Sequence, residues 1–181
     1  MNAHACGLTD ERGFRNALGN FATGVAIITA EVDGIKLGST VSSFNSVSLK
    51  PPLVLFSVAH TAYGLPLWKA AKALAISILA EHQTELSNRF AKSSGAKWDG
   101  LGDWRAGNGA PLPPDTLLHF ECRPYAVHEA GDHDIFVCEV TSYADHHPGQ
   151  RPLLFFSGRY RRLAQEDGTR APEDNLWLHG W

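Results

Sequence analysis

The stretch GSTVSSFNSVSL at residues 38–49, with the apolar run LVLF that follows it at 53–56, decides how the chain is interpreted. Val41, Val47 and Leu49 are typical of a strand, yet half of the twelve positions carry hydroxyls. A core strand seldom carries so many polar groups, because each needs a hydrogen-bond partner when buried. Small hydroxyls beside accessible backbone N–H groups suit a phosphate or a flat ligand with a polar edge, whereas a half-exposed strand with a serine-rich solvent face explains them equally well.

Length and composition indicate an ordinary globular protein and exclude several classes of partner. The chain has 181 residues, of which 44% are apolar and 19% charged, and this is the balance of a folded domain. We expect one domain over residues 10–163 and a tail over 164–181. The net charge of −3 gives no electrostatic reason to expect nucleic acid or anionic lipid as a partner.

Targeting and redox signals favour the cytoplasm. No apolar run is long enough to span a membrane, and residues 1–6 lack the basic and apolar regions of a signal peptide. Cys6, Cys122 and Cys138 are too widely spaced for a disulfide framework or a CxxC metal motif. We interpret Cys122 and Cys138 as small buried side chains within strands. The histidines between 128 and 147 match no zinc-ligand spacing, so no metal site is predicted.

Short strand patterns dominate the rest of the chain. Asp33-Gly34 is a strong hairpin signal, and Pro51-Pro52 ends the strand that carries the hydroxyls. A helix is expected to start near Thr9, with Phe14 and Leu18 packing against a sheet. Further helices are expected over 61–71 and 81–90, and strands over 23–30, 35–49, 53–58, 72–79, 116–127, 135–140 and 152–160. Seven or eight strands without βαβ alternation predict a mainly β, antiparallel Greek-key barrel with a few short peripheral helices.

Several motifs, in the right order and spacing, resemble the short-chain flavin reductase family. They are Thr23-Gly24-Val25, the stretch at 39–48 with Pro51-Pro52, Gln83 with residues 86–91, Gly131-Asp132-His133, and residues 152–160. The resemblance runs from about Phe14 to Leu163. It implies an FMN-binding split β-barrel, normally a homodimer with flavin sites near the subunit interface. Members are commonly the reductase components of two-component monooxygenases, and they reduce FMN or FAD with NADH or NADPH and release the reduced flavin.

The resemblance also implies roles for individual residues. His133 would lie near the open face of the flavin and orient the nicotinamide, and hydride transfer from nicotinamide C4 to flavin N5 needs no protein acid or base. Either Arg89 or Lys92 would hold the flavin phosphate, and the resemblance does not decide between them. The predicted flavin-binding residues are Thr23, Gly24, Ser39, Thr40, Val41, Ser42, Ser43, Ser46, Ser57, Val58, Ala59, Ser77, Leu79, Gln83, Arg89, Phe90, Lys92 and Tyr160.

Plainer interpretations stand beside these roles. A lone turn histidine more often bonds its own backbone, and basic residues at a helix end are most often solvated. Two other functions also stay open at this point. One is a reductase that keeps FMN bound and reduces another acceptor, and the other is a flavin- or haem-binding protein without turnover.

Overall fold

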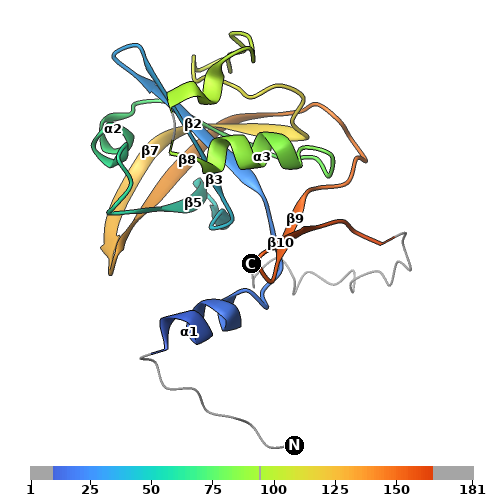
Figure 1. Cartoon of the computed structure of the whole chain (residues 1–181). Helices are drawn as coiled ribbons and strands as arrows, with labels where there is room; N and C mark the ends of the chain where they lie inside the picture. Colours follow the sequence, from blue (N-terminus) through green and yellow to red (C-terminus); the bar gives the residue numbers. More distant parts are fainter. Residues whose placement is uncertain (1–9, 94, 165–181) are drawn as a thin grey trace, which may run out of the picture.

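The computed structural model describes residues 10–93 and 95–164, and Figure 1 shows their arrangement. These residues form two antiparallel sheets with three short α-helices and one 3-10 helix. The strands are β1 (Thr23–Gly24), β2 (Ala26–Val32), β3 (Ile35–Val41), β4 (Asn45–Leu49), β5 (Pro52–Ala59), β6 (Leu74–Ile78), β7 (Leu118–Ala130), β8 (His133–Asp145), β9 (Leu154–Phe156) and β10 (Arg159–Arg161). The helices are α1 (Glu11–Leu18), α2 (Leu65–Ala70), α3 (Thr84–Ala91) and the 3-10 helix η1 (Gly95–Trp98).

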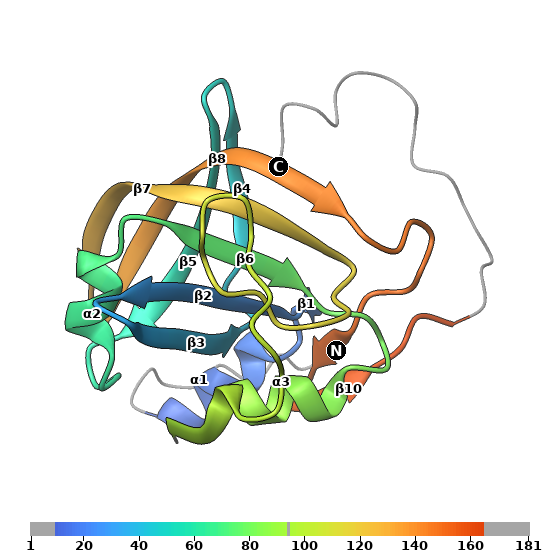
Figure 2. The same ribbon diagram turned by 90° about the horizontal axis from the view of Figure 1, so that it is seen from above.

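The large sheet has the order β3-β2-β6-β7-β8-β5-β4, and the small sheet has the order β1-β9-β10. After the β2–β3 hairpin the chain crosses to the far end of the sheet as β4 and β5, then returns beside β2 as β6. Figure 2 shows the large sheet curling so that β5 lies behind β2 and β6. The sheet does not close, because β3 and β4 remain as its two edges. The predicted antiparallel split barrel with few helices is therefore confirmed. It has more strands than expected, because the strand predicted over 35–49 divides into β3 and β4 at opposite edges.

Two hairpins show how local sequence sets the strand boundaries. Asp33 and Gly34 both have positive φ, 51° and 79°, as the two central residues of a type I′ turn require, and the predicted β2–β3 hairpin forms around them. Ser157 and Gly158 also have positive φ, 49° and 72°. The single strand predicted over 152–160 is therefore wrong, since the chain turns there and makes the β9–β10 hairpin.

The main core fills the inside of the curled sheet. Ile28 and Ile76 from β2 and β6 pack in one cluster with Phe56 and Phe136 from β5 and β8. The rings of Phe56 and Phe136 stack with centroids 5.2 Å apart, and Trp68 of α2 meets Phe56 edge-on. Cys122 and Cys138 belong to the same cluster and are each 1% exposed, which confirms their prediction as buried side chains.

A second cluster lies on the outer face of β2 and β6, under α3. It contains Ile27, Leu79, Phe90 and Leu153. The long loop after η1 covers the neighbouring part of this face. There the Glu121 carboxylate of β7 accepts hydrogen bonds from the backbone N–H groups of Gly107 and Asn108.

Helix α1 differs from its prediction. Its N-cap is Asp10, whose carboxylate accepts a hydrogen bond from the Gly13 N–H at 2.8 Å. The helix was expected to pack on the sheet, but it buries none of its residues, and Figure 1 shows it standing apart from both sheets. Phe14, Leu18 and Phe21 are 52%, 60% and 77% exposed. The expected packing is thus wrong for these residues in a single chain.

Two other expectations concern the C-terminal tail and membrane-spanning segments. The predicted tail lies outside the described residues from position 165 onward. Within residues 10–93 and 95–164, no helix has the length and apolar character needed to cross a bilayer.

Candidate functional site

The hydroxyl-rich stretch spans both free edges of the large sheet, because its first part ends β3 and its second part forms β4. Strand β3 pairs with β2 alone, and an edge strand leaves the peptide groups on its other side available to a ligand. Two of the hydroxyls already hold the protein together. The Thr40 hydroxyl donates to the Ser87 carbonyl of α3 at 2.7 Å, and the Ser43 hydroxyl accepts from the Ser57 N–H of β5 at 3.0 Å. These two bonds tie the end of β3 to α3 and the turn after β3 to β5.

The other members of the stretch are more accessible. Ser42 is exposed in the turn after β3, and Ser39 and Ser46 are half-buried in β3 and β4. Val41 packs against the main core. The stretch is thus neither a core strand nor a simple solvent face, because its hydroxyls alternate between structural bonds and open positions.

A cavity of about 330 Å³ opens beside this edge. Its walls are residues 35–39 of β3, the segment between Ala62 and Trp68, residues 91–93 after α3, and Lys97 with Trp98 of η1. The wall contains three lysines, Lys36, Lys92 and Lys97, and no Asp or Glu among the described residues. We call it the lysine cavity.

A second hollow, of about 910 Å³, runs along α3 and shares Lys92 with the lysine cavity. We call it the α3 hollow. Its wall mixes both signs of charge, with Arg89 beside Glu85, Asp99 and Asp115. A third hollow, of about 550 Å³, lies by the β2–β3 turn and contains none of the predicted site residues.

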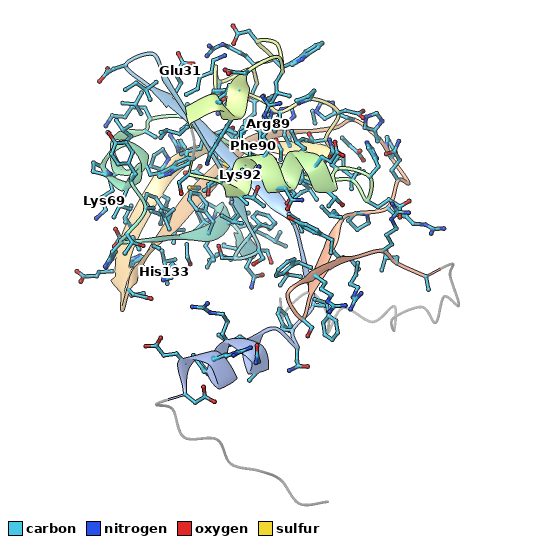
Figure 3. The ribbon with its side chains drawn as sticks, viewed as in Figure 1. Glu31, Lys69, Arg89, Phe90, Lys92 and His133 are labelled. Atoms are coloured by element: carbon cyan, nitrogen blue, oxygen red, sulfur yellow. The ribbon has the colours of Figure 1, made fainter. Side chains whose placement is uncertain are left out.

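The contacts of α3 distinguish the two candidates for the phosphate. The Arg89 guanidinium donates to the backbone carbonyls of Ala96 and Asp99, so it ties η1 and the following turn to the helix. Lys92 is exposed, and its ammonium forms no hydrogen bond or ion pair with any described residue. Figure 3 shows Arg89, Phe90 and Lys92 together at the C-terminal half of α3. The geometry favours Lys92 as the cation that is available to a phosphate.

Four predicted residues have side chains that the protein itself encloses. Ser77, Leu79 and Phe90 are completely buried, and Gln83 is 6% exposed. The Gln83 side chain accepts from the Ala80 N–H at 2.9 Å and donates to the Pro114 carbonyl at 3.0 Å. The protein thus encloses these four side chains, and their predicted contact with flavin stays a prediction.

Phe90 also explains a glycine that sequence reasoning missed. A Cβ at Gly38 would lie 2.4 Å from Cε1 of Phe90, far closer than van der Waals contact. Phe90 in turn meets the Trp98 ring edge-on, with centroids 5.0 Å apart. Gly38 therefore lets helix α3 approach the edge strand closely enough for both to line one cavity.

Tyr160 joins the small sheet to α3. Its hydroxyl donates to the Asn88 side chain at 3.0 Å and lies 2.8 Å from the Ser87 hydroxyl. In the same sheet, Thr23 and Gly24 of β1 pair with Phe155 and Leu154 of β9. Tyr160 thus ties the small sheet to α3, while Thr23 and Gly24 belong to an edge strand of that sheet.

His133 lies at the tip of the β7–β8 hairpin, opposite Ala59 of β5. Its Nδ1 is 2.7 Å from the Asp132 carboxylate, and the hydrogen bond with His133 lowers the pKa of Asp132. The register also places Ser57 and Val58 beside Ile135 and Asp134. The structure therefore brings the predicted group Ser57, Val58, Ala59 and His133 together on two neighbouring strands.

The next residue, Asp134, has a buried carboxylate held by an imidazole and an ammonium. Its Oδ1 is 3.1 Å from Nε2 of His60, and its Oδ2 is 2.6 Å from Nζ of Lys69. Lys69 and, after it, His60 lower the pKa of Asp134 against the opposing effect of desolvation. In Figure 3 His133 and Lys69 lie on one side of the molecule and Lys92 on another. The segment from His60 to Lys69 links the two places, because its middle residues line the lysine cavity.

Comparison with known proteins places this geometry in a family. Residues 18–164 match the family described as flavin reductase like domain. The chain is 45% identical over 158 residues to the FMN reductase (NADH) SmoA of Agrobacterium fabrum, covering 87% of this chain and 88% of that protein. It is 35% identical over 164 residues to HsaB of Rhodococcus jostii, the reductase subunit of a flavin-dependent monooxygenase, covering 90% and 83%.

Solved structures agree with the sequence relatives. The NADH:FAD oxidoreductase SgcE6 of Streptomyces globisporus, in complex with NAD and FAD fragments, superposes with a TM-score of 0.86 at 34% identity, covering 92% of this chain and 100% of that one. Component B of a nitrilotriacetate monooxygenase from Mycobacterium thermoresistibile gives a TM-score of 0.87 at 33% identity, covering 93% and 95%. The chain therefore belongs to the flavin reductase like domain family.

Proposed function

We propose that this protein is an NADH-dependent flavin reductase that reduces FMN or FAD and releases the reduced flavin to a separate monooxygenase. The observation that carries the proposal is the match over residues 18–164, together with 45% identity to a relative named FMN reductase (NADH). A relative at 35% identity is named as the reductase subunit of a two-protein monooxygenase. The first of these two names gives NADH as the hydride donor. The assay described below compares NADPH with NADH.

The residues at the edge of β3 fit a flavin nucleotide. A free strand edge offers peptide groups to a flat ring with a polar rim, and Ser39 and Ser42 add accessible hydroxyls. Lys92 supplies an available cation for a phosphate. When bound, the flavin accepts the hydride that the nicotinamide gives up, and NADH is thereby oxidised to NAD⁺. The chain supplies proximity and alignment, with His133 positioned to orient the donor.

The exposed face of α1 supports a homodimer. Phe14, Leu18 and Phe21 are all more than half exposed, and each forgoes about 1.5–3 kcal/mol of burial in a single chain. We infer that a second copy covers this face. Leu18→Glu should convert the dimer to a monomer in light scattering, and a wild-type monomer would contradict the inference.

The buried thiols of Cys122 and Cys138 favour a reducing compartment such as the cytoplasm.

A steady-state assay tests the proposed activity. Purified protein should oxidise NADH, followed at 340 nm, only when FMN or FAD is added, and NADPH and riboflavin serve as comparison substrates. Tight retention of FMN through gel filtration, without reduction of added flavin, would instead indicate a reductase of another acceptor. Binding of FMN with no NADH or NADPH oxidation at all would contradict the proposal and indicate a non-catalytic flavin-binding protein.

A further inference from the structure

Lys97 is a second cation of the lysine cavity, and the predicted site did not include it. We propose that Lys97 and Trp98 bind a phosphate group of a nucleotide substrate in this cavity, together with Lys92. The inference rests on the proposed function, because it assigns the part of the same site that would recognise phosphate.

The ammonium of Lys97 is fixed by two backbone carbonyls. Its Nζ donates to Gly38 of β3 at 2.8 Å and to Phe90 of α3 at 3.0 Å. An ammonium has three N–H donors and no acceptor. Two of them are therefore used, and the third is left for a group inside the cavity that Lys97 lines. Because both carbonyls belong to rigid elements, the charge is held in place before any ligand arrives.

The charge balance of the cavity favours an anion. Lys36 is neutralised by Asp103, with Nζ and Oδ1 2.6 Å apart. Lys97 binds carbonyls, and Lys92 has no partner among the described residues, so these two cations face the cavity without a carboxylate. Two uncompensated ammonium groups around one cavity suit a phosphate, whose oxygens accept several charge-assisted hydrogen bonds.

Trp98 adds an independent observation. Its Nε1–H is enclosed and has no hydrogen-bond partner among the described residues, although a buried indole N–H usually finds one. The Trp98 side chain lines the cavity next to Lys97. It is held by the edge-on Phe90 ring and by the Lys36 ammonium, which lies 5.6 Å from the indole centroid. Because Nε1 is enclosed, an acceptor on a bound ligand reaches this donor only when the side chains around it move aside.

Burial gives the interaction a distinctive pH dependence. Desolvation lowers the pKa of Lys97 below the ordinary lysine value. The protonated form binds phosphate, so affinity should be complete at neutral pH and should fall, as the pH rises, earlier than an exposed lysine would allow. Lys92, also facing the cavity, is exposed, and Lys36 is paired with Asp103.

Three variants separate binding from structure. Lys97→Gln removes the charge but keeps an N–H donor for the carbonyls, and Lys97→Arg keeps the charge. Lys72→Gln removes an exposed charge from the third hollow and is the matched control. For each protein, KM and equilibrium affinity are measured with FMN and with riboflavin, which lacks the phosphate. The donor arm compares NADH with 1-benzyl-1,4-dihydronicotinamide, which also lacks phosphate.

We expect Lys97→Gln to weaken binding of one phosphate-bearing substrate about tenfold or more, the cost of one charge-assisted hydrogen bond. A selective loss for FMN over riboflavin identifies the flavin phosphate, and a selective loss for NADH over the benzyl compound identifies the dinucleotide phosphates. Lys97→Arg should restore the affinity and move the alkaline loss to higher pH, and Lys72→Gln should match wild type.

Two results would overturn the inference. One is an unchanged Lys97→Gln, and the other is an equal loss for substrates with and without phosphate, which would make Lys97 a structural bridge only. Either result can be distinguished from a failure of the proposed function. Wild-type turnover of riboflavin with NADH tests the activity itself, and affinities measured without turnover test the phosphate site.

Discussion

The lysine cavity and the α3 hollow share Lys92, yet the charged residues that line them differ. The wall of the α3 hollow carries both signs of charge, because Glu85, Asp99 and Asp115 lie there with Arg89 and Lys92. The Arg89 guanidinium is held by two backbone carbonyls there. In the lysine cavity two ammonium groups lack a carboxylate, and one indole N–H lacks an acceptor. The charge of the walls, rather than the size of the two spaces, is therefore why we propose the smaller one as the phosphate site.

The largest effect is expected from Gly38→Ala, which adds a methyl group to the wall of the lysine cavity. In Gly38→Ala the new Cβ would lie 2.4 Å from the fully buried Phe90 ring, and such overpacking costs about 1–3 kcal/mol or more. We expect a lower free energy of unfolding in urea and a loss of flavin affinity. Gly24→Ala is the control for the unfolding measurement alone, because nothing lies within 4 Å of its Cβ. A Gly38→Ala protein as stable as wild type would show that α3 can move away from β3.

The next effect distinguishes the two cations of α3. Lys92→Gln should weaken FMN binding about tenfold, with riboflavin binding and stability unchanged, since its ammonium has no structural partner. Arg89→Gln should do the reverse and lower the free energy of unfolding by about 1 kcal/mol for each carbonyl that it releases. Fluorescence titration and urea unfolding on both variants check the pair. An Arg89→Gln protein with weaker FMN binding and unchanged stability would contradict the distinction drawn between Arg89 and Lys92.

A smaller effect is expected at the hairpin tip, outside both hollows. His133→Ala should raise the KM for NADH several-fold and change the KM for FMN less, because we place His133 on the donor side of the site. His128→Ala, in an exposed position on the same hairpin, is the matched control. Equal rises in both KM values would remove His133 from the donor side.

The smallest effect concerns the neutralised charges of the α3 hollow. His82 and His147, with Nε2 atoms 3.1 and 2.7 Å from the carboxylate oxygens of Asp115, lower the pKa of Asp115. A carboxyl with a lowered folded pKa stabilises the protein above its unfolded pKa of about 3.9, and this stabilisation disappears as the pH falls through the folded value. Because the pair is exposed, Asp115→Asn should cost only about a few tenths of a kcal/mol at pH 6, and this cost should shrink as the pH falls below about 3.9. Urea midpoints at several pH values measure it, and an unchanged FMN affinity is the expected control.

Features that depend on nearby residues could be predicted from the sequence. Asp33-Gly34 set the β2–β3 hairpin because both residues tolerate positive φ, and the ordered motifs identified the family. The alternating hydroxyls indicated an accessible strand, and β3 is an edge. The assignment of each predicted residue to flavin or nicotinamide remains a prediction that the variants above address.

Features that depend on distant contacts could not be predicted. Phe14 and Leu18 have the spacing of a packed helix face, and periodicity cannot say whether the partner is the same chain or another. Lys97 and Trp98 lie outside every helix and strand predicted from the sequence, and only the fold carries them to Gly38. Gln83 and Phe90 lie in a motif but face inward, because a helix presents its residues on all sides.

The two described cysteines acquire a further meaning in a protein that handles reduced flavin. Reduced flavin that meets oxygen before its acceptor yields hydrogen peroxide, and peroxide attacks thiolates rather than thiols. Burial raises the pKa of Cys122 and brings that of Cys138 to about 12, so almost no thiolate forms. A chain that produces an oxidant as a by-product thus keeps these sulfur atoms in the form that the oxidant attacks least.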